Sequence, residues 1–347
     1  MRTLASVQRI REITPIQNAD RIELAHILGW QCVVKKGEFK PNDLCVYYEI
    51  DSFLPVRAEY EFLRNSSYRK SELLGEGFRL RTQTFRGEIS QGLALPLLSV
   101  LEYDDMCKEG DDLTEVLGVR KWEIPEKATS GGTVIGELPG SIPATDETRI
   151  QAMPELLQEF AGLPYYISTK MDGSSHSIGY DAAGLHVTGH TYEYQDDGKC
   201  GFYEYCKKHG LPEKLEAYHK EYPNVHTLTL QGEYCGPGMQ KNRLRLNRPV
   251  WYLFDVRINE HRAPLEFLLE IAERFGIETV PVEETGLDLP SKYPTVEALL
   301  ARADGDYPNG GKKEGIVIRP TTPQHCQALG TDLSMKVINN AYLLKHD

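Results

Sequence analysis

Short segments with strand-like patterns fill the first 120 residues of this 347-residue chain. Leu44–Ile50 reads Leu-Cys-Val-Tyr-Tyr-Glu-Ile, the composition of a buried strand, and basic residues alternate along Phe78–Thr84. Turn signals separate the segments from one another. The segments are Ser6–Ile13, Glu23–Leu28, Gln31–Lys35, Leu44–Ile50, Phe78–Thr84 and Ser90–Leu95. Short strands in this arrangement predict a small β-barrel over residues 1–120.

The pattern changes after residue 120. Residues 121–142 contain proline and glycine without a helical or strand period, so we expect an extended linker there. From residue 143 to residue 347, strand-like and helical patterns mix, which predicts a second domain and the α+β class. A helix is expected at Thr145–Gln151, where an N-cap residue precedes acidic residues, and another at Leu265–Phe275, before Gly276.

The net charge of −12 excludes a uniformly basic nucleic-acid binder. Contact with phosphates would have to come from a local basic patch or from bound cations. The seven cysteines are odd in number and form no Cys-x-x-Cys pair, which excludes a disulfide framework and a zinc site. The chain has neither a secretory signal nor an apolar run of membrane-spanning length. We therefore expect an intracellular protein, with cytoplasm, nucleus and organelle matrix left open.

The sharpest local signal is the segment Ser168-Thr-Lys170-Met-Asp172-Gly173. A strand delivers a lysine into a polar turn, an aspartate follows two residues later, and the glycine allows a tight bend. This pattern suits a nucleophilic amine, provided that burial or a nearby cation disfavours the charged form. Taken alone, the segment is explained equally well as a surface turn with an exposed lysine.

Four further segments place a reactive or aromatic group on a strand or at its end. Each also has an ordinary structural explanation, because Phe254 suits a core and Glu314 suits the edge of a strand. The segments are Leu230-Gln-Gly-Glu233-Tyr, Trp251-Tyr-Leu-Phe254-Asp255-Val, Lys313-Glu314-Gly-Ile-Val-Ile-Arg319 and Ser334-Met-Lys336-Val. Their order along the chain carries the functional interpretation.

In this order, the segments from about Thr145 to Lys345 resemble the covalent nucleotidyltransferase superfamily of nucleic-acid ligases and mRNA capping enzymes. The N-terminal region resembles the OB-type module that precedes the catalytic domain in one group of RNA ligases, whereas DNA ligases carry an OB domain after the last lysine motif. The segments that carry this second resemblance are Asn18–Ala25, Lys35–Lys40, Tyr47–Pro55 and Arg86–Leu93. The resemblance implies an OB-like barrel over residues 1–120, a linker over 121–142, and a nucleotidyltransferase (ATP-grasp-like ligase) domain over 143–347, with antiparallel sheets and flanking helices.

The resemblance also implies roles for individual residues in an ATP-dependent RNA ligase. Lys170 matches the lysine that forms the AMP phosphoramidate, Phe254 the aromatic residue that stacks on adenine, and Lys336 the lysine on the α-phosphate. Glu314 matches an acid that helps to hold a catalytic Mg²⁺ or Mn²⁺ ion. The implied catalytic residues are Lys170, Glu314 and Lys336; the nucleotide-binding residues are Arg149, Thr169, Lys170, Asp172, Gly173, Glu233, Phe254 and Lys336; the metal ligands are Asp172, Glu233, Asp255 and Glu314.

Two positions depart from the pattern of the superfamily. Many relatives carry a second lysine two residues after the last motif lysine, where this chain has Ile338. Lys312 and Lys313 are the candidates to replace it. Many relatives also carry Ser-Arg in the strand turn after the nucleophile, where this chain has Gly-His-Thr at residues 189–191, so the ribose contact is left open.

Two stretches of this acidic chain are locally basic. Lys241–Arg248 has four basic residues and no acidic one, and Arg57–Arg86 has seven basic residues against four acidic ones. Each is either a solvated face or a surface for phosphates. With the resemblance, we expect a monomeric ligase that uses ATP to join RNA 5′-phosphate and 3′-hydroxyl ends, in a nicked or bridged duplex, during RNA repair. The alternatives are a capping guanylyltransferase, a DNA ligase and a non-catalytic RNA-binding protein.

Overall fold

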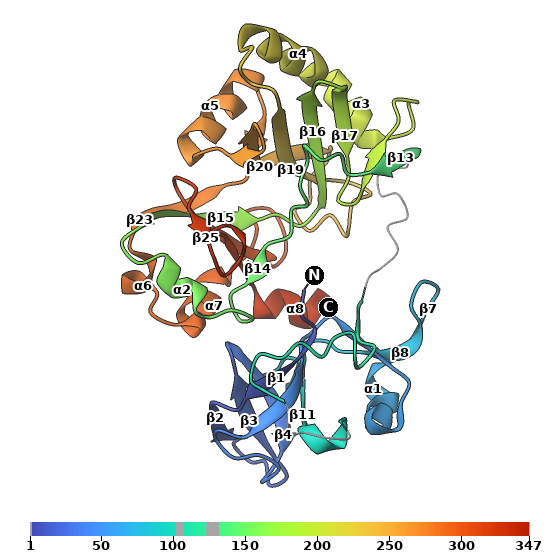
Figure 1. The fold of residues 1–347 in the computed structure, drawn as a ribbon, viewed down its shortest axis with the longest axis vertical. Helices are drawn as coiled ribbons and strands as arrows, with labels where there is room; N and C mark the ends of the chain where they lie inside the picture. Colours follow the sequence, from blue (N-terminus) through green and yellow to red (C-terminus); the bar gives the residue numbers. More distant parts are fainter. Residues whose placement is uncertain (1, 102–106, 123–131, 347) are drawn as a thin grey trace. The chain divides into compact units, whose positions relative to one another are not determined.

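The computed structural model describes residues 2–101, 107–122 and 132–346, and the chain divides into two compact units (Figure 1). The N-terminal unit contains Met1–Pro125 with the short segments Gln151–Pro154 and Leu343–Asp347. The C-terminal unit contains Glu126–Ile150 and Glu155–Tyr342. Each unit has its own buried hydrophobic core.

Short antiparallel strands build the N-terminal unit, as the sequence predicts. The strands are β1 (Ala5–Arg9), β2 (Glu12–Pro15), β3 (Ile22–Ile27), β4 (Trp30–Lys35), β5 (Leu44–Tyr48), β6 (Ser52–Pro55), β7 (Tyr68–Ser71), β8 (Gly75–Arg79), β9 (Gln83–Phe85), β10 (Glu88–Ser90), β11 (Leu93–Pro96) and β12 (Arg120–Lys121). They pair in the orders β1-β5-β11, β2-β3-β4, β10-β9 and β12-β6-β8-β7. Three short helices join them: η1 (Ala58–Leu63), α1 (Arg64–Ser67) and η2 (Leu97–Ser99).

Alternation along the strands decides which side chains are buried in this unit. In β4 the side chains of Trp30, Cys32 and Val34 are buried and those between them are more exposed, because successive residues point to opposite faces of a sheet. The hydroxyl groups of Tyr48 and Tyr60 lie 2.9 Å apart inside the core, so these buried polar atoms satisfy each other.

The larger sheet of the C-terminal unit runs in the order β13-β18-β17-β16-β19-β20-β21, with β22 paired to β20. Helices α3 (Gly201–Lys208), α4 (Leu211–Glu221) and α5 (Leu265–Phe275) cover one face of it (Figure 1). In α5 the buried residues Leu268, Ile271 and Phe275 share one stripe, and Gly276 ends the helix in the left-handed conformation. The strands are β13 (Val134–Glu137), β16 (Ser174–Asp181), β17 (Gly184–Thr188), β18 (Tyr192–Tyr194), β19 (Leu228–Cys235), β20 (Val250–Ile258), β21 (His261–Arg262) and β22 (Glu278–Thr279).

A smaller sheet in the same unit runs in the order β14-β27-β24-β15-β23. Its strands are β14 (Thr148–Arg149), β15 (Pro164–Lys170), β23 (Val282–Leu287), β24 (Gly315–Pro320) and β27 (Met335–Ile338). Strand β14 pairs with β27 in parallel, and the other pairings are antiparallel. The remaining elements are α2 (Leu156–Glu159), α6 (Leu289–Lys292), α7 (Val296–Ala303), α8 (Asn340–His346), β25 (His325–Cys326) and β26 (Thr331–Asp332).

Two segments differ from the prediction made from the sequence. No helix forms at Thr145–Gln151, since Thr148–Arg149 instead pairs with Met335–Lys336 of β27. The partner strand lies far away in the sequence, and tertiary pairing of this kind overrides a local capping signal. Within the expected linker, β13 pairs with β18 and extends the larger sheet, while residues 123–131 lie outside the described residues.

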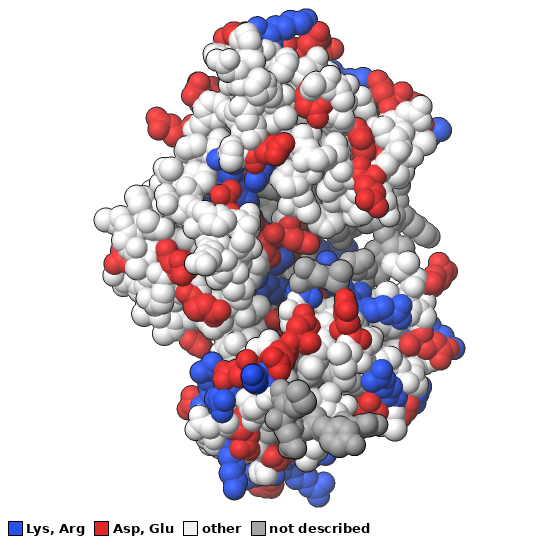
Figure 2. Space-filling model, in the orientation of Figure 1, with Lys and Arg blue, Asp and Glu red and all other residues white. Residues whose placement is uncertain are grey.

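Basic and acidic side chains are interspersed over the face of the molecule seen in Figure 2. The negative net charge is therefore not gathered into one acidic surface on that face. Among the described residues, none of the helices combines the length and the hydrophobicity that crossing a membrane requires.

Candidate active site

Lys170 is the last residue of β15, a strand of the smaller sheet that lies between β23 and β24. Its side chain is 24% exposed, and its Nζ lies 2.9 Å from Oε1 of Glu314. The backbone at this point is also fixed, because the hydroxyl of Tyr307 donates to the carbonyl of Lys170 (2.7 Å) and accepts from the N–H of Glu314 (3.1 Å). Two segments far apart in sequence thus hold the lysine and its carboxylate partner together.

The turn after Lys170 packs against the end of β19. The N–H of Gly173 donates to Oε1 of Glu233 at 3.1 Å. A Cβ on Gly173 would lie 2.5 Å from the carbonyl oxygen of Tyr234 and 2.7 Å from Sγ of Cys235, so no larger residue fits without a shift. This close approach brings Glu233 toward Lys170.

Charges dominate the surroundings of Lys170. Burial opposes its positive charge, but the carboxylates of Glu314, Glu233 and Asp172 outweigh burial and raise the pKa of Lys170 above its usual range. Burial raises the pKa of Glu233 to about 8; Lys170 opposes the rise, and Glu314 and Asp172 add to it. A divalent cation held by Glu233 and Glu314 would favour the ionised form of Glu233 and would disfavour the charged form of Lys170.

Asp172 is 5% exposed, and partners occupy both of its carboxylate oxygens. The hydroxyl of Tyr342 donates to Oδ1 at 3.1 Å, and the guanidinium of Arg243 pairs with Oδ2. Arg243 also donates to the hydroxyl of Tyr342 at 3.1 Å. The sequence placed Arg243 only in a basic stretch, and nothing in that pattern distinguished it from its exposed neighbours.

A pocket of about 180 Å³ opens beside Lys170 between the two sheets of the C-terminal unit. It contains Thr169, Lys170, Glu233, Phe254 and Lys336 from the predicted set. Gly173 and Glu314 contact members of this group, through Glu233 and Lys170 respectively. Asp172 is paired instead with Arg243 and Tyr342 and does not line the pocket. The other residues of the lining are Thr145, Asp146, Glu147, Ser168, Met171, Ser175, His190, Val280, Val317 and Arg319.

Lys336 and Arg149 face each other in the parallel pairing of β14 with β27. Nζ of Lys336 lies 4.0 Å from Oδ1 of Asp146, and Nε2 of His190 lies 3.9 Å from Oδ2 of the same residue. His190 therefore lies at the pocket in the segment where relatives carry Ser-Arg. Ile338, in the place of a second lysine, is buried.

The two lysines proposed to replace that second lysine are both paired elsewhere. Nζ of Lys313 lies 2.9 Å from both carboxylate oxygens of Glu283, and Lys312 contacts Asp304 at 3.3 Å. Neither lines the pocket, whereas Arg319 does. Among the pocket residues that the structure describes, the lysine and arginine side chains are those of Lys170, Arg319 and Lys336.

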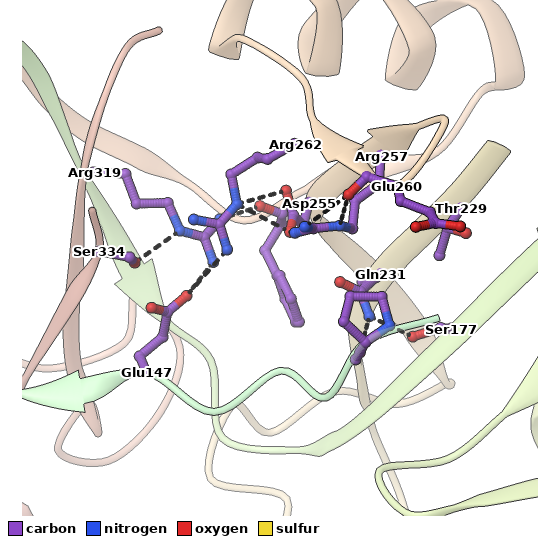
Figure 3. Close-up of polar contacts among 12 residues, drawn as sticks. Glu147, Ser177, Thr229, Gln231, Asp255, Arg257, Glu260, Arg262, Arg319 and Ser334 are labelled. Atoms are coloured by element: carbon purple, nitrogen blue, oxygen red, sulfur yellow. Dashed lines mark hydrogen bonds and ion pairs between the residues drawn. The ribbon is translucent and has the colours of Figure 1, made fainter. Parts of the chain in front are cut away.

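Arg319 belongs to a buried network that joins β24 to the larger sheet (Figure 3). It donates to the carbonyl oxygen of Phe254 at 2.6 Å, to Oε1 of Glu147 at 2.5 Å and to Oγ of Ser334 at 3.2 Å. Burial opposes the charge of Glu147, but Arg319 and Arg262 outweigh it and lower the pKa of Glu147 to about 2. The network holds the backbone of Phe254 at the pocket.

Asp255 lies in the same network rather than in the lining of the pocket (Figure 3). Its carboxylate is 3.1 Å from Nε of Arg262 and 3.4 Å from Nη1 of Arg257. Two guanidinium groups therefore hold this carboxylate away from the pocket that Lys170 lines.

Among the described residues, no three His, Cys, Asp or Glu side chains converge as a ready metal site. Glu233 and Glu314 nonetheless fit a divalent cation, since both supply carboxylate oxygens, Glu233 lines the pocket, and Glu314 lies 2.9 Å from Lys170.

Sequence profiles of known families match both units. A profile described as an OB-fold domain matches residues 4–97, and a profile described as RNA ligase matches residues 163–338. The solved structure of Naegleria gruberi RNA ligase with PPi is 34% identical, with a TM-score of 0.87, and covers 100% of this chain and 99% of that chain. Variants of the same enzyme with AMP and Mn, and with ATP and Mn, are 33% and 34% identical, each with a TM-score of 0.88 and 99% coverage of both chains. No curated protein sequence matches the chain significantly.

Proposed function

Since the chain belongs to the RNA ligase family, we propose that it joins RNA ends with ATP through an AMP group carried on Lys170. The expected order of an OB-type barrel before a ligase domain is confirmed. The observation that carries the residue assignment is the position of Lys170. Its side chain lines the pocket, and its Nζ lies 2.9 Å from Oε1 of Glu314.

In the first step the neutral amine of Lys170 attacks the α-phosphate of ATP, a nitrogen–phosphorus bond forms, and pyrophosphate leaves. The amine has to lose its proton first, and Glu314, Glu233 and Asp172 oppose that loss. Mg²⁺ or Mn²⁺ held by Glu233 and Glu314 would supply positive charge at the phosphates. Lys336 and Arg319 line the same pocket and are placed to balance the charge of the α-phosphate and to hold the nucleotide.

Phe254 supplies the flat apolar surface of the pocket, which suits stacking against adenine. Arg319 fixes its carbonyl, so the position of this ring depends on the buried network and not on a flexible loop. Thr169 and Gly173 flank the lysine, and Arg149 lies beside Lys336 in the sheet. We assign these residues to nucleotide binding on that support.

In the later steps AMP passes from Lys170 to an RNA 5′-phosphate, and the 3′-hydroxyl then displaces AMP to make the phosphodiester. We propose a nicked or bridged duplex as the substrate, with the OB-type unit supplying part of the RNA-binding surface. The enzyme works as a monomer in this proposal. Its support is that every residue assigned to ATP lies in the C-terminal unit of one chain.

Covalent labelling tests the proposal directly. The full chain, incubated with α-labelled ATP and Mg²⁺ or Mn²⁺, should retain label after denaturation, and Lys170→Ala should not. Labelling with α-labelled GTP instead would identify a capping guanylyltransferase. Matched RNA and DNA nicks, with each strand exchanged in turn, separate an RNA ligase from a DNA ligase. Retention of label in Lys170→Ala would place the nucleophile elsewhere.

A further inference from the structure

The loop between β19 and β20 carries the basic stretch Lys241–Arg248, which the assigned nucleotide site does not use. The structure divides this stretch into two parts. Lys241, Arg245 and Arg248 are exposed, and the described residues give none of them an ion pair. The side chain of Arg243 is instead 10% exposed and contacts Asp172.

The backbone of the loop between β19 and β20 fixes the inward direction of the Arg243 side chain. Gly311 donates its N–H to the carbonyl of Arg243 at 3.1 Å, and a Cβ on Gly310 would lie 2.0 Å from the same carbonyl oxygen. The side chain of Asn242, at a positive φ of 44°, bonds both the N–H and the carbonyl of Leu246. A strained, braced loop of this kind holds one arginine at a defined position.

The guanidinium of Arg243 is oriented but not fully satisfied. One nitrogen, Nη1, serves Asp172 and the hydroxyl of Tyr342, and the cationic carbon lies 4.9 Å from the centre of the Tyr342 ring. Its Nε is buried and has no hydrogen-bond partner among the described residues. A buried donor left without an acceptor is destabilising, so its retention points to an acceptor that arrives with a ligand.

The ligand is not the nucleoside held in the pocket, because Arg243 is not part of the pocket lining. Arg243 nevertheless lies within electrostatic range of Glu314, the carboxylate partner of Lys170. It is therefore near the reacting centre but outside the nucleotide pocket. An oxygen acceptor that reaches Arg243 at this position belongs either to the pyrophosphate of ATP or to the phosphate of an RNA end.

We propose that the Nε–H of Arg243 binds an oxygen of the RNA 5′-phosphate, and that Lys241, Arg245 and Arg248 attract the adjoining phosphodiesters. The exposed cations on the same loop favour the RNA end over pyrophosphate, since an extended polyanion can contact several of them at once. Asp172 and Tyr342 then act as positioning residues that aim the guanidinium. This inference rests on the proposed function of the chain as an RNA ligase.

Arg243→Lys in the full chain provides the test, because it keeps the positive charge toward Asp172 and removes the Nε–H donor and the planar fork. Arg274→Lys, on the exposed face of α5, is the matched control. Binding is measured to nicked RNA that ends in a 5′-phosphate or a 5′-hydroxyl. Wild type and Arg274→Lys should prefer the phosphate. Arg243→Lys should lose at least 10-fold of that preference, and transfer of AMP from preformed enzyme–AMP should fall at least 10-fold.

Two outcomes would overturn the inference. If labelling by ATP falls in Arg243→Lys while AMP transfer from preformed enzyme–AMP keeps its rate, the oxygen belongs to pyrophosphate. If the preference for the 5′-phosphate is unchanged, Arg243 only positions Asp172. Wild-type enzyme that forms no protein–AMP and seals no RNA would instead refute the proposed function itself, before any variant is compared.

A second variant covers the case in which Arg243→Lys does not fold. Lys241→Ala/Arg245→Ala changes only exposed side chains. Each lost phosphate contact should reduce the slope of log affinity against log salt by about 1, with labelling by ATP unchanged. An unaltered affinity and slope for nicked RNA would count against the loop as an RNA-binding surface.

Discussion

Replacing Glu147 with Gln should destabilise the ligase domain by about 3 kcal/mol at neutral pH. The side chain of Glu147 is 12% exposed and contacts Arg319 at 2.5 Å. A pKa lowered from 4.5 to about 2 corresponds to about 3 kcal/mol of folding free energy. Glutamine keeps one acceptor oxygen for Arg319 but leaves a buried guanidinium without its counter-charge, and breaking a buried pair in this way costs on the order of 3–5 kcal/mol.

The sign of the pH dependence follows from the lowered pKa of Glu147. The stabilisation is fully present above pH 4.5, where the carboxyl is ionised in both the folded and the unfolded chain. It is lost as the pH falls from 4.5 toward 2, where the folded protein must also take up the proton. The free-energy difference between wild type and Glu147→Gln should therefore be constant between pH 7 and pH 5 and shrink below pH 4.5.

Urea unfolding followed by circular dichroism measures this difference at each pH. Glu216→Gln is the control, because its pair with Lys220 is exposed and should contribute little to stability. ATP should also bind Glu147→Gln more weakly, since Arg319 holds the carbonyl of Phe254. A loss below about 1 kcal/mol, or one that does not change between pH 5 and pH 3, would refute the reasoning.

Three further results are expected. Glu314→Ala should need a higher Mg²⁺ or Mn²⁺ concentration for labelling of Lys170, since it removes a carboxylate of the proposed cation site; wild-type rates at low metal would contradict this. The metal concentration needed by wild type should fall as the pH rises through about 8, where Glu233 ionises, and Glu233→Gln should abolish that dependence. Gly173→Ala should reduce labelling at least 10-fold, because its Cβ would meet Tyr234 at 2.5 Å, and normal labelling with normal thermal stability would show that the turn can adjust.

The sequence was sufficient for the residues whose chemistry is marked by a local pattern. The composition of Leu44–Ile50 predicted β5, and the amphipathic pattern of Leu265–Phe275 predicted α5. The Lys170 turn and the later segments predicted several residues that line the pocket. It was insufficient where long-range pairing decided the outcome. Thr148–Arg149 had a helix-start pattern and became a strand on β27.

Charge patterns were the least informative part of the sequence. Asp255 and Glu233 are both acidic residues in strand-like segments of the sequence. In the structure, however, the carboxylate of Asp255 is held by Arg257 and Arg262. Arg243 belonged to a uniform basic stretch, and only the folded loop turns it toward Asp172. Which charges meet depends on contacts between segments that a single sequence does not record.

The pairing of β14 with β27 determines when, during synthesis of the chain, the smaller sheet can be completed. Arg149 and Lys336 are neighbours in the sheet, yet almost the whole ligase domain separates them along the chain. During synthesis, the nascent chain carries Lys170 long before Met335–Ile338 exists, and until then the edge of β24 has no partner on that side. Contacts of such long sequence separation form late in folding. A ribosome-bound fragment that ends before β27 should therefore not be adenylylated, and the nascent protein would spend no ATP until the last strand of its sheet had been made.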